Sequence, residues 1–489
     1  MRYDVVIIGS GLGGLVCASL LAKAGKHVVV VERHRQPGGC LQGYRRQGLS
    51  FDTGFHYVGG LGEGQRLQRV FSSLGLMRLP WQRLDADGFD RVTIGGQTFR
   101  LAEGHERFVD TLACDFPAER AALQRYVAMV QQVEATSMTP YDMCRQFGQS
   151  AYGYLTSTFR DPLLINVLSG TALTMELQRQ SLPLFVFAHA GGGCIAGAWR
   201  LRGCGHLLAE TLATSIRQAG GDIVCGTEAV ELLERDGLIE ALRCSNGETY
   251  QGQVFISDIH PAHTFAMLRE SRLLKGIFWR RISSIENTMG MFTASLVLKP
   301  RMLRYFNHNK FVYLKPNVWS PPLSLCQPGE RTADVDRVMV SCRVPTDGTD
   351  DARQIDLLTP MPWSCCERWA DTQVEHRGEE YADMKHRMAE ACITLAEREI
   401  PGLSSMIQEQ YTSTPLTWRD YTQTPYGSAY GIRKDCNNLM LTMLSPRTPI
   451  PNLMLTGQNL MLHGVEGVTM TALKTCEAII DNVQSIIDS

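Results

Sequence analysis

The stretch that decides the fold of this chain is YDVVIIGSGLGGLVCASLLAKAGKHVVVVE, residues Tyr3–Glu32. It opens with a short β-branched run, which is typical of a buried parallel strand. The middle has the apolar spacing of a helix that ends at Gly25, and a second β-branched run follows. This order of strand, helix and strand is a βαβ unit, so the sequence predicts an α/β fold with a Rossmann-type domain.

A glycine-rich turn between the first strand and the helix matches the pattern G-x-G-x-x-G. Gly9 permits the tight turn, Gly11 lets a diphosphate approach the backbone, and Gly14 lets the helix pack closely on the strand. Glu32 ends the second strand, where a carboxylate binds ribose hydroxyls and repels a 2′-phosphate, so FAD or NAD is favoured over NADP. The expected cofactor contacts here are Gly9, Ser10, Gly11, Leu12, Gly13, Gly14, Glu32 and Arg33.

The composition excludes several other classes of protein. The 489 residues are 44% hydrophobic and 20% charged, which is enough to bury a sizeable core. The formal net charge of -2 gives no broad basic field, so nucleic acid is not an expected partner. The 15 cysteines show no CxxC pair and no zinc-ligand spacing, so we expect reduced thiols, a cytoplasmic protein and no metal.

The segment Gln180–Trp199 is uncharged and about as long as a membrane-spanning helix needs to be. It contains a proline, a histidine and three successive glycines, so we expect an interior wall or a peripheral membrane contact instead. Its glycines around Gly191–Ala196 resemble a second dinucleotide pattern, but no helix follows at the right distance, which favours a substrate-side loop. NAD(P)H or another reductant would then reach the bound cofactor without a dedicated domain.

Three further motifs carry a resemblance to a known family. The pair Gly38–Gly39 follows Glu32 with the spacing E-x5-G-G, and FDTGFHYVGG lies at Phe51–Gly60. More than 400 residues after the first motif comes RTPIPNLMLTGQNLMLHGVEGVTMTALKTCEAII, Arg447–Ile480. Together these motifs resemble the FAD-dependent superfamily of amine oxidases and phytoene desaturases. The likeness is greatest to carotenoid isomerases and to retinol saturases, the all-trans-retinol 13,14-reductases.

The resemblance implies that FAD is the cofactor, with its isoalloxazine ring against Gly54. It also implies that Gly467 and Val468 open the last helix toward flavin N1, where a helix N-terminus stabilises negative charge. Cys40 stands where amine oxidases and bacterial phytoene desaturases usually have Arg, as in retinol-saturase-like chains. The implied cofactor contacts beyond the first turn are Gly38, Gly39, Cys40, Gly54, His56, Val230, Gly457, Gln458, Gly467 and Val468.

The positions of these motifs predict a discontinuous FAD-binding domain. Its three parts are residues 1–85, 198–270 and 420–489. The two inserts, 86–197 and 271–419, hold helix-rich stretches, β-branched runs and a charged helix, and we expect them to form an α+β substrate-binding lobe.

Three residues near the expected flavin ring are candidate catalytic groups. His56 and His463 are the only histidines in the two motifs that border the ring, and Glu466 follows three positions after His463. Each is a candidate to protonate a carbon that has received a hydride. The alternative is that these side chains only hold a ribityl hydroxyl or the backbone.

The resemblance implies an FAD-dependent oxidoreductase acting on carbon–carbon double bonds of a hydrophobic polyene or isoprenoid-like substrate. Saturation, isomerisation and desaturation, each by hydride transfer at flavin N5, all remain open. One alternative is an amine-oxidase-type enzyme, for which Tyr426 and Tyr430 are the candidates for an aromatic pair. Another is a non-catalytic, prenyl-binding relative of Rab GDP-dissociation inhibitors.

Overall fold

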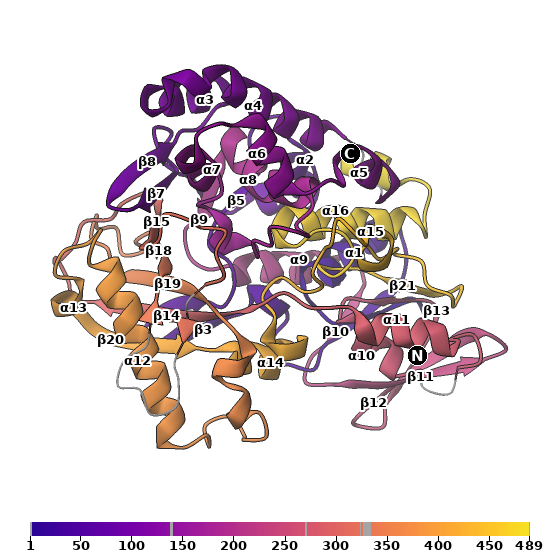
Figure 1. Cartoon of the computed structure of the whole chain (residues 1–489). Helices are drawn as coiled ribbons and strands as arrows, with labels where there is room; N and C mark the ends of the chain where they lie inside the picture. The colour runs from indigo at the N-terminus through magenta and orange to yellow at the C-terminus, as the bar shows by residue number, and fades with distance from the viewer. Residues whose placement is uncertain (1, 137–139, 269–270, 323, 326–333, 489) are drawn as a thin grey trace.

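The computed structural model describes all residues except 1, 137–139, 269–270, 323, 326–333 and 489 (Figure 1). Its first large sheet has a parallel core in the order β10-β2-β1-β13-β21. These strands are Asp222–Val224, Val28–Val31, Arg2–Ile8, Thr249–Ser257 and Leu453–Leu455. The predicted βαβ unit is confirmed, with helix α1 at Leu12–Lys23 between β1 and β2.

The parallel core is buried because helices cover it. All four valines of β2 are buried, as β-branched residues in a doubly covered parallel sheet should be. Helix α1 packs against α9 (His206–Gln218) and α16 (Gly464–Glu477). Strands β11 (Ala229–Arg235) and β12 (Leu238–Cys244) continue from β13 as an antiparallel meander.

The second large sheet has the order β20-β14-β19-β18-β15-β7-β8. Its strands are Ile407–Ser413, Gly290–Leu298, Gln354–Met361, Arg337–Cys342, Asn309–Tyr313, Asp90–Ile94 and Gln97–Leu101. All pairs are antiparallel except β7 with β15. Helix α12, Glu379–Ala396, shares a separate apolar core with this sheet. The fold class, a Rossmann-type α/β domain with an α+β insert, is therefore confirmed, while the domain limits stay a prediction.

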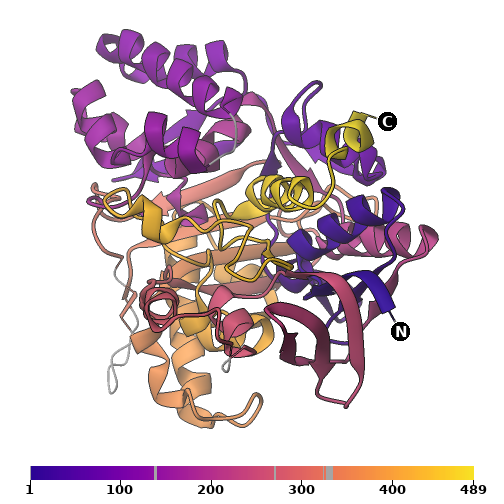
Figure 2. The same ribbon diagram turned by 90° about the vertical axis from the view of Figure 1, so that its right-hand side faces the viewer.

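A group of helices lies at the end of the molecule opposite α12 in both views (Figures 1 and 2). They are α3 (His105–Asp115), α4 (Arg120–Ala135), α5 (Pro140–Phe147), α6 (Ala151–Thr158), α7 (Pro162–Leu168) and α8 (Leu184–Ala196). The prediction of a substrate-side loop around Gly191–Ala196 was wrong, because these residues form the end of helix α8. A Cβ on Gly59 would lie 2.3 Å from the carbonyl carbon of Gly193. A Cβ on Gly192 would lie 2.5 Å from Val130 Cγ1, whereas a Cβ on Gly191 would meet no atom of the described residues within 4 Å, so close packing explains only some of these glycines.

Shorter elements connect these layers. The strands are β3 (Gly43–Arg46), β4 (Leu49–Asp52), β5 (Val58–Gly59), β6 (Trp81–Arg83), β9 (Ala198–Leu201), β16 (Ser324–Leu325) and β17 (Asp334–Val335). The helices are α2 (Arg66–Ser73), α10 (Pro261–Ala266), α11 (Gly276–Ser284), α13 (Leu403–Met406), α14 (Pro415–Thr422), α15 (Leu439–Thr442) and α17 (Val483–Asp488). None of the helices in the described part of the chain has the length and apolar character needed to cross a membrane.

Candidate functional site

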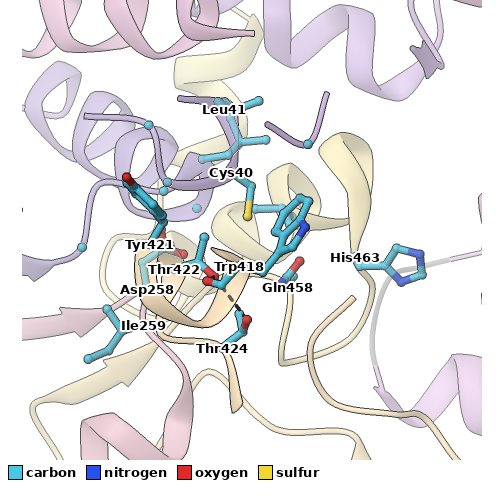
Figure 3. Close-up of a pocket in the computed structure, with 18 of the residues that line it drawn as sticks. Cys40, Leu41, Asp258, Ile259, Trp418, Tyr421, Thr422, Thr424, Gln458 and His463 are labelled. Atoms are coloured by element: carbon cyan, nitrogen blue, oxygen red, sulfur yellow. Dashed lines mark hydrogen bonds between the residues drawn. The ribbon is translucent and has the colours of Figure 1, made fainter. Parts of the chain in front are cut away.

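A cavity of about 340 Å³ lies at the carboxyl ends of β1, β2 and β13, the edge where open α/β sheets bind ligands. Its walls come from the glycine turn, the loop after β4, the end of β13, helix α14 and the start of α16. Figure 3 shows Asp258 and Tyr421 on one side of the view and His463 on the other, with Cys40, Trp418 and Gln458 between them. Segments distant in sequence thus form one elongated site.

Most of the predicted site residues line this cavity. They are Gly9, Ser10, Gly11, Leu12, Gly13, Glu32, Arg33, Gly38, Gly39, Cys40, Gly54, His56, Gln458, His463 and Val468. Five predicted residues do not line it: Gly14, Val230, Gly457, Gly467 and Glu466. Val230 is 43% exposed, while its neighbour Ala229 is in the wall. The predicted contacts themselves stay predictions.

The two glycine turns form a cradle that side chains would fill. Gly9 has a φ of +89°, in the left-handed region that favours glycine. A Cβ on Gly11 would lie 2.4 Å from Asp258 Oδ2, and a Cβ on Gly39 would lie 3.0 Å from the α-carbon of Gly11. Gly9, Gly11 and Gly13 line the cavity, so the backbone at the start of α1 borders it, which fits the diphosphate of a dinucleotide.

Asp258 is a cavity residue that sequence reasoning missed. Burial raises the pKa of its carboxyl to about 7, and the charge of Glu32 adds to this, while hydrogen bonds from the Gly14 and Gly11 backbone oppose it. Its carboxylate thus lies directly beneath the glycine turn. The available signal was its position immediately after a strand that pairs with β1.

Glu32 is held rigidly at the end of β2. Its side chain is buried, Oε2 accepts from the Ser10 backbone N–H at 3.0 Å, and Oε1 accepts from the His34 N–H at 2.8 Å. Arg33 donates instead to the carbonyl oxygens of Asp420, at 2.6 Å, and Tyr421, at 2.8 Å. Glu32 therefore presents a fixed carboxylate to this end of the cavity, whereas Arg33 binds the last turn of α14.

At the other end of the cavity, His56 carries a neutral imidazole, and one of its ring nitrogens has no hydrogen-bond partner among the described residues. Burial lowers the pKa of its imidazole to about 4, and although Asp356 opposes this, Arg343 and Arg200 lower it further. Its Nδ1 is buried and has no hydrogen-bond partner in the described part of the chain. A buried nitrogen without a partner is uncommon in folded proteins, so His56 stays a candidate for a functional role.

The adjacent Tyr57 joins His56 in the wall and is bonded to a buried acid. Its phenol donates to Asp90 Oδ2 at 2.9 Å, and Asn309 donates to Asp90 Oδ1 at 2.8 Å. Burial raises the pKa of Asp90 to about 7, and burial and the charge of Asp90 raise the pKa of Tyr57 well above its usual value. Tyr57 therefore stays protonated at neutral pH.

Beneath His56 lies a buried ion network. Arg343 contacts Asp52 Oδ2 at 2.5 Å and Asp356 Oδ2 at 2.7 Å. Burial alone would lower the pKa of Arg343, but Asp356 and Asp52 raise it. No sequence signal identifies this network, because its three members come from the end of β4, the residue after β18 and strand β19.

His463 is fixed by its neighbours. Its Nε2 is 3.0 Å from the Thr174 carbonyl oxygen, so Nε2 carries the proton, and burial lowers the pKa of the ring to about 4. Its ring lies 4.8 Å from that of Tyr430, whose phenol donates to the Leu173 carbonyl at 2.6 Å. Tyr426 is 63% exposed and packs on Trp363, so it does not face Tyr430 across the cavity.

A Rossmann sheet with a glycine turn and a second sheet that closes the cavity define a Rossmann-type, dinucleotide-binding α/β fold with an α+β insert. The family model described as NAD(P)-binding Rossmann-like domain matches residues 7–74. All-trans-retinol 13,14-reductase of Rattus norvegicus is 26% identical over 525 residues, which cover 98% of this chain and 86% of that protein. Prolycopene isomerase 2, chloroplastic, of an Oncidium hybrid cultivar is 23% identical, and the alignment covers 88% of this chain and 75% of that protein.

Another relative is the neurosporene-forming phytoene desaturase of Rhodobacter capsulatus, which is 24% identical and covers 87% of this chain and 84% of its own. Among solved structures, an oxidoreductase from Methanosarcina mazei has a TM-score of 0.67, with 15% identity over 98% of this chain and all of that one. A double mutant of putrescine oxidase has a TM-score of 0.63, with 14% identity over all of both chains.

These findings confirm the resemblance predicted from the sequence. The homologues are named as retinol reductases, prolycopene isomerases and phytoene desaturases, and the amine oxidases share the fold. They also confirm the predicted class, an enzyme of the oxidoreductase and isomerase type.

Proposed function

We propose that this chain is an FAD-dependent oxidoreductase that acts on carbon–carbon double bonds of a long apolar polyene. The observation that carries the proposal is the single cavity that extends from the glycine turn and Glu32 to a wall of buried histidine and tyrosine side chains. The names of the homologues support a retinoid or carotenoid as the substrate.

The residues present fit FAD along the length of the cavity. Glu32 would accept hydrogen bonds from the adenosine ribose, and the N-terminus of α1 with the Gly38–Gly39 turn would hold the diphosphate. The first turn of α16 would face the pyrimidine edge of the ring, where a helix dipole favours negative charge. When bound, FAD supplies a ring that accepts or donates a hydride at N5.

The chain itself must hold and move the proton. At neutral pH His56 is deprotonated, so it suits removal of a proton from a substrate carbon, the direction of desaturation. For saturation, Tyr57 is the better donor when Asp90 is protonated: Asp90 would then donate to the phenol oxygen, and the phenol proton would pass to the carbon. His463, whose Nε2 proton is directed at Thr174, would position the ring or the substrate.

The alternatives have less support from the site. An amine oxidase would be expected to present an aromatic pair, and the exposed position of Tyr426 removes the pair proposed from the sequence. A prenyl-binding protein without chemistry would not need titratable side chains on the cavity wall, and the named homologues are enzymes.

The test uses purified protein under anaerobic conditions. We expect a bound flavin that is released on denaturation, bleaches on reduction and changes the mass or geometry of a polyene. A control with reduced FAD and no protein excludes free-flavin chemistry. Protein that retains no flavin, even after incubation with FAD, would contradict the proposal.

A further inference from the structure

A second cavity of about 120 Å³ adjoins the main one between α8 and the first turn of α16. The two cavities share the wall residues Tyr57, Thr174, His463, Gly464 and Val465. Apolar side chains such as Val186 and Leu462 form much of the smaller cavity. A substrate that passes the rings of Tyr57 and His463 would enter it.

Two polar side chains face each other in this smaller cavity. His189 Nε2 lies 4.0 Å from Glu466 Oε2, and the two side chains are only 10% and 19% exposed. Neither makes a hydrogen bond to any residue that the structure describes. The gap is too long for a direct hydrogen bond, but an oxygen atom about 2.8 Å from both would fit between them.

The charges around this gap determine whether a carboxylate oxygen or a neutral hydroxyl oxygen can bind there. Burial raises the pKa of the nearby Glu134 to about 7, and the charge of Glu466 adds to this. The Glu134 Oε1 atom is buried without a hydrogen-bond partner among the described residues, and Arg66 instead donates to the backbone carbonyls of Glu134 and Thr136. A second carboxylate would therefore be repelled, whereas a neutral group that donates a proton would be bound.

Glycines of α8 bring its backbone close to both carboxyl groups. A Cβ on Gly192 would lie 3.1 Å from Glu134 Oε1, and a Cβ on Gly193 would lie 3.2 Å from Glu466 Oε2. Burial lowers the pKa of His189, although Glu466 opposes this, so its imidazole is neutral at pH 7. A neutral Nε2–H can donate to a hydroxyl oxygen while the hydroxyl donates to Glu466.

We infer that His189 and Glu466 form an end-group subsite that binds the terminal hydroxyl of a polyene alcohol and rejects a polyene carboxylate. This inference rests on the proposed function and narrows its substrate class. It gives Glu466 a binding role in place of the proton-donor role expected from the sequence.

The test compares ligands that share one polyene and differ at the end group. All-trans-retinol, its methyl ether and all-trans-retinoic acid are titrated into the flavin-loaded protein, and kcat/KM is measured for each. The variants are Glu466→Leu, which removes the acceptor, Glu466→Gln, which removes only its charge, and His189→Phe, which removes the donor. The control is Glu477→Gln, which changes an exposed carboxylate at the other end of α16 that pairs with Lys474 at 2.7 Å.

The unaltered protein is expected to bind the alcohol at least about tenfold more tightly than the ether, because the ether cannot donate to Glu466. Glu466→Leu should reduce this ratio to about one, because it leaves no acceptor for the hydroxyl. His189→Phe should weaken binding of alcohol and ether alike, because either oxygen can accept from Nε2. Glu466→Gln should weaken the discrimination against the acid, and Glu477→Gln should change none of these. Equal binding of alcohol and ether by the unaltered protein, or an unchanged ratio in Glu466→Leu, would overturn the subsite.

Turnover separates the remaining explanations. If Glu466→Gln reduces kcat equally for alcohol and ether, Glu466 is the proton donor and the subsite is refuted. If the unaltered protein turns over no polyene, the proposed function fails, while the binding preference for the alcohol still tests the subsite. Turnover of hydrocarbon carotenoids without binding of retinol would support the proposed function and overturn the hydroxyl subsite.

Discussion

Replacing Glu32 tests where the cofactor lies. In Glu32→Gln the side chain keeps its shape, but an uncharged amide replaces the carboxylate whose oxygens would accept hydrogen bonds from the ribose. A charge-assisted hydrogen bond contributes about 1.5 to 3 kcal/mol, and 1.4 kcal/mol is a factor of ten, so the Kd for FAD should rise roughly 10- to 150-fold. Because Glu32 also accepts from the Ser10 and His34 backbones, Glu32→Ala should weaken binding further by loosening the turn.

The assay is titration of the flavin-free protein with FAD, followed by flavin fluorescence. FMN is the matched ligand control, since it lacks the adenosine that Glu32 would bind and its affinity should change little. Glu240→Gln, on the exposed side of β12, is the matched protein control. An unchanged Kd for FAD in Glu32→Gln, or equal losses for FAD and FMN, would refute the placement of the adenosine end.

The remaining predictions concern the turn, the wall of the cavity and pH. Gly11→Ala should abolish FAD retention, because its Cβ would lie 2.4 Å from Asp258 Oδ2; full flavin content after purification would be the contrary result. His56→Gln should lower turnover by about 100-fold with flavin retained, and near-normal turnover with an unchanged pH profile would exclude a proton-transfer role. The pKa of Asp90 is raised from 3.8 to about 7 on folding, so the folded state binds more protons between these values and stability should fall as pH rises through them. Urea unfolding at several pH values should show a smaller fall for Asp90→Asn, and an identical fall would contradict the assignment.

The sequence was sufficient for the Rossmann half of the fold because its signals are local. The β-branched run of β2 and the glycines of the first turn each specify a conformation within a few residues. The glycines of α8 show the limit of such signals. Their helix propensity is low, yet they lie in α8, whose backbone at Gly193 packs against Gly59, and no local pattern reports such a long-range contact.

The residues of the candidate site also fall into those that local motifs identify and those that only the folded structure brings together. Motif residues such as Glu32 and His56 could be named in advance, but their protonation states could not, because these depend on burial and on distant charges. Arg343, with its two aspartates, and the pair His189 and Glu466 are brought together only by tertiary packing. Nothing in the spacing of these residues along the chain predicts that they meet.

The most direct test of the central claim is an anaerobic reaction of flavin-loaded protein with a panel of polyenes, in both the oxidised and the reduced state, analysed by chromatography and mass spectrometry. The account predicts at least one polyene that gains or loses two hydrogens, or changes double-bond geometry, in stoichiometric single turnover. The same reaction should be lost in Gly11→Ala, which cannot hold the flavin. No change in any polyene in either state, together with hydrogen peroxide release from amines under air, would contradict the account.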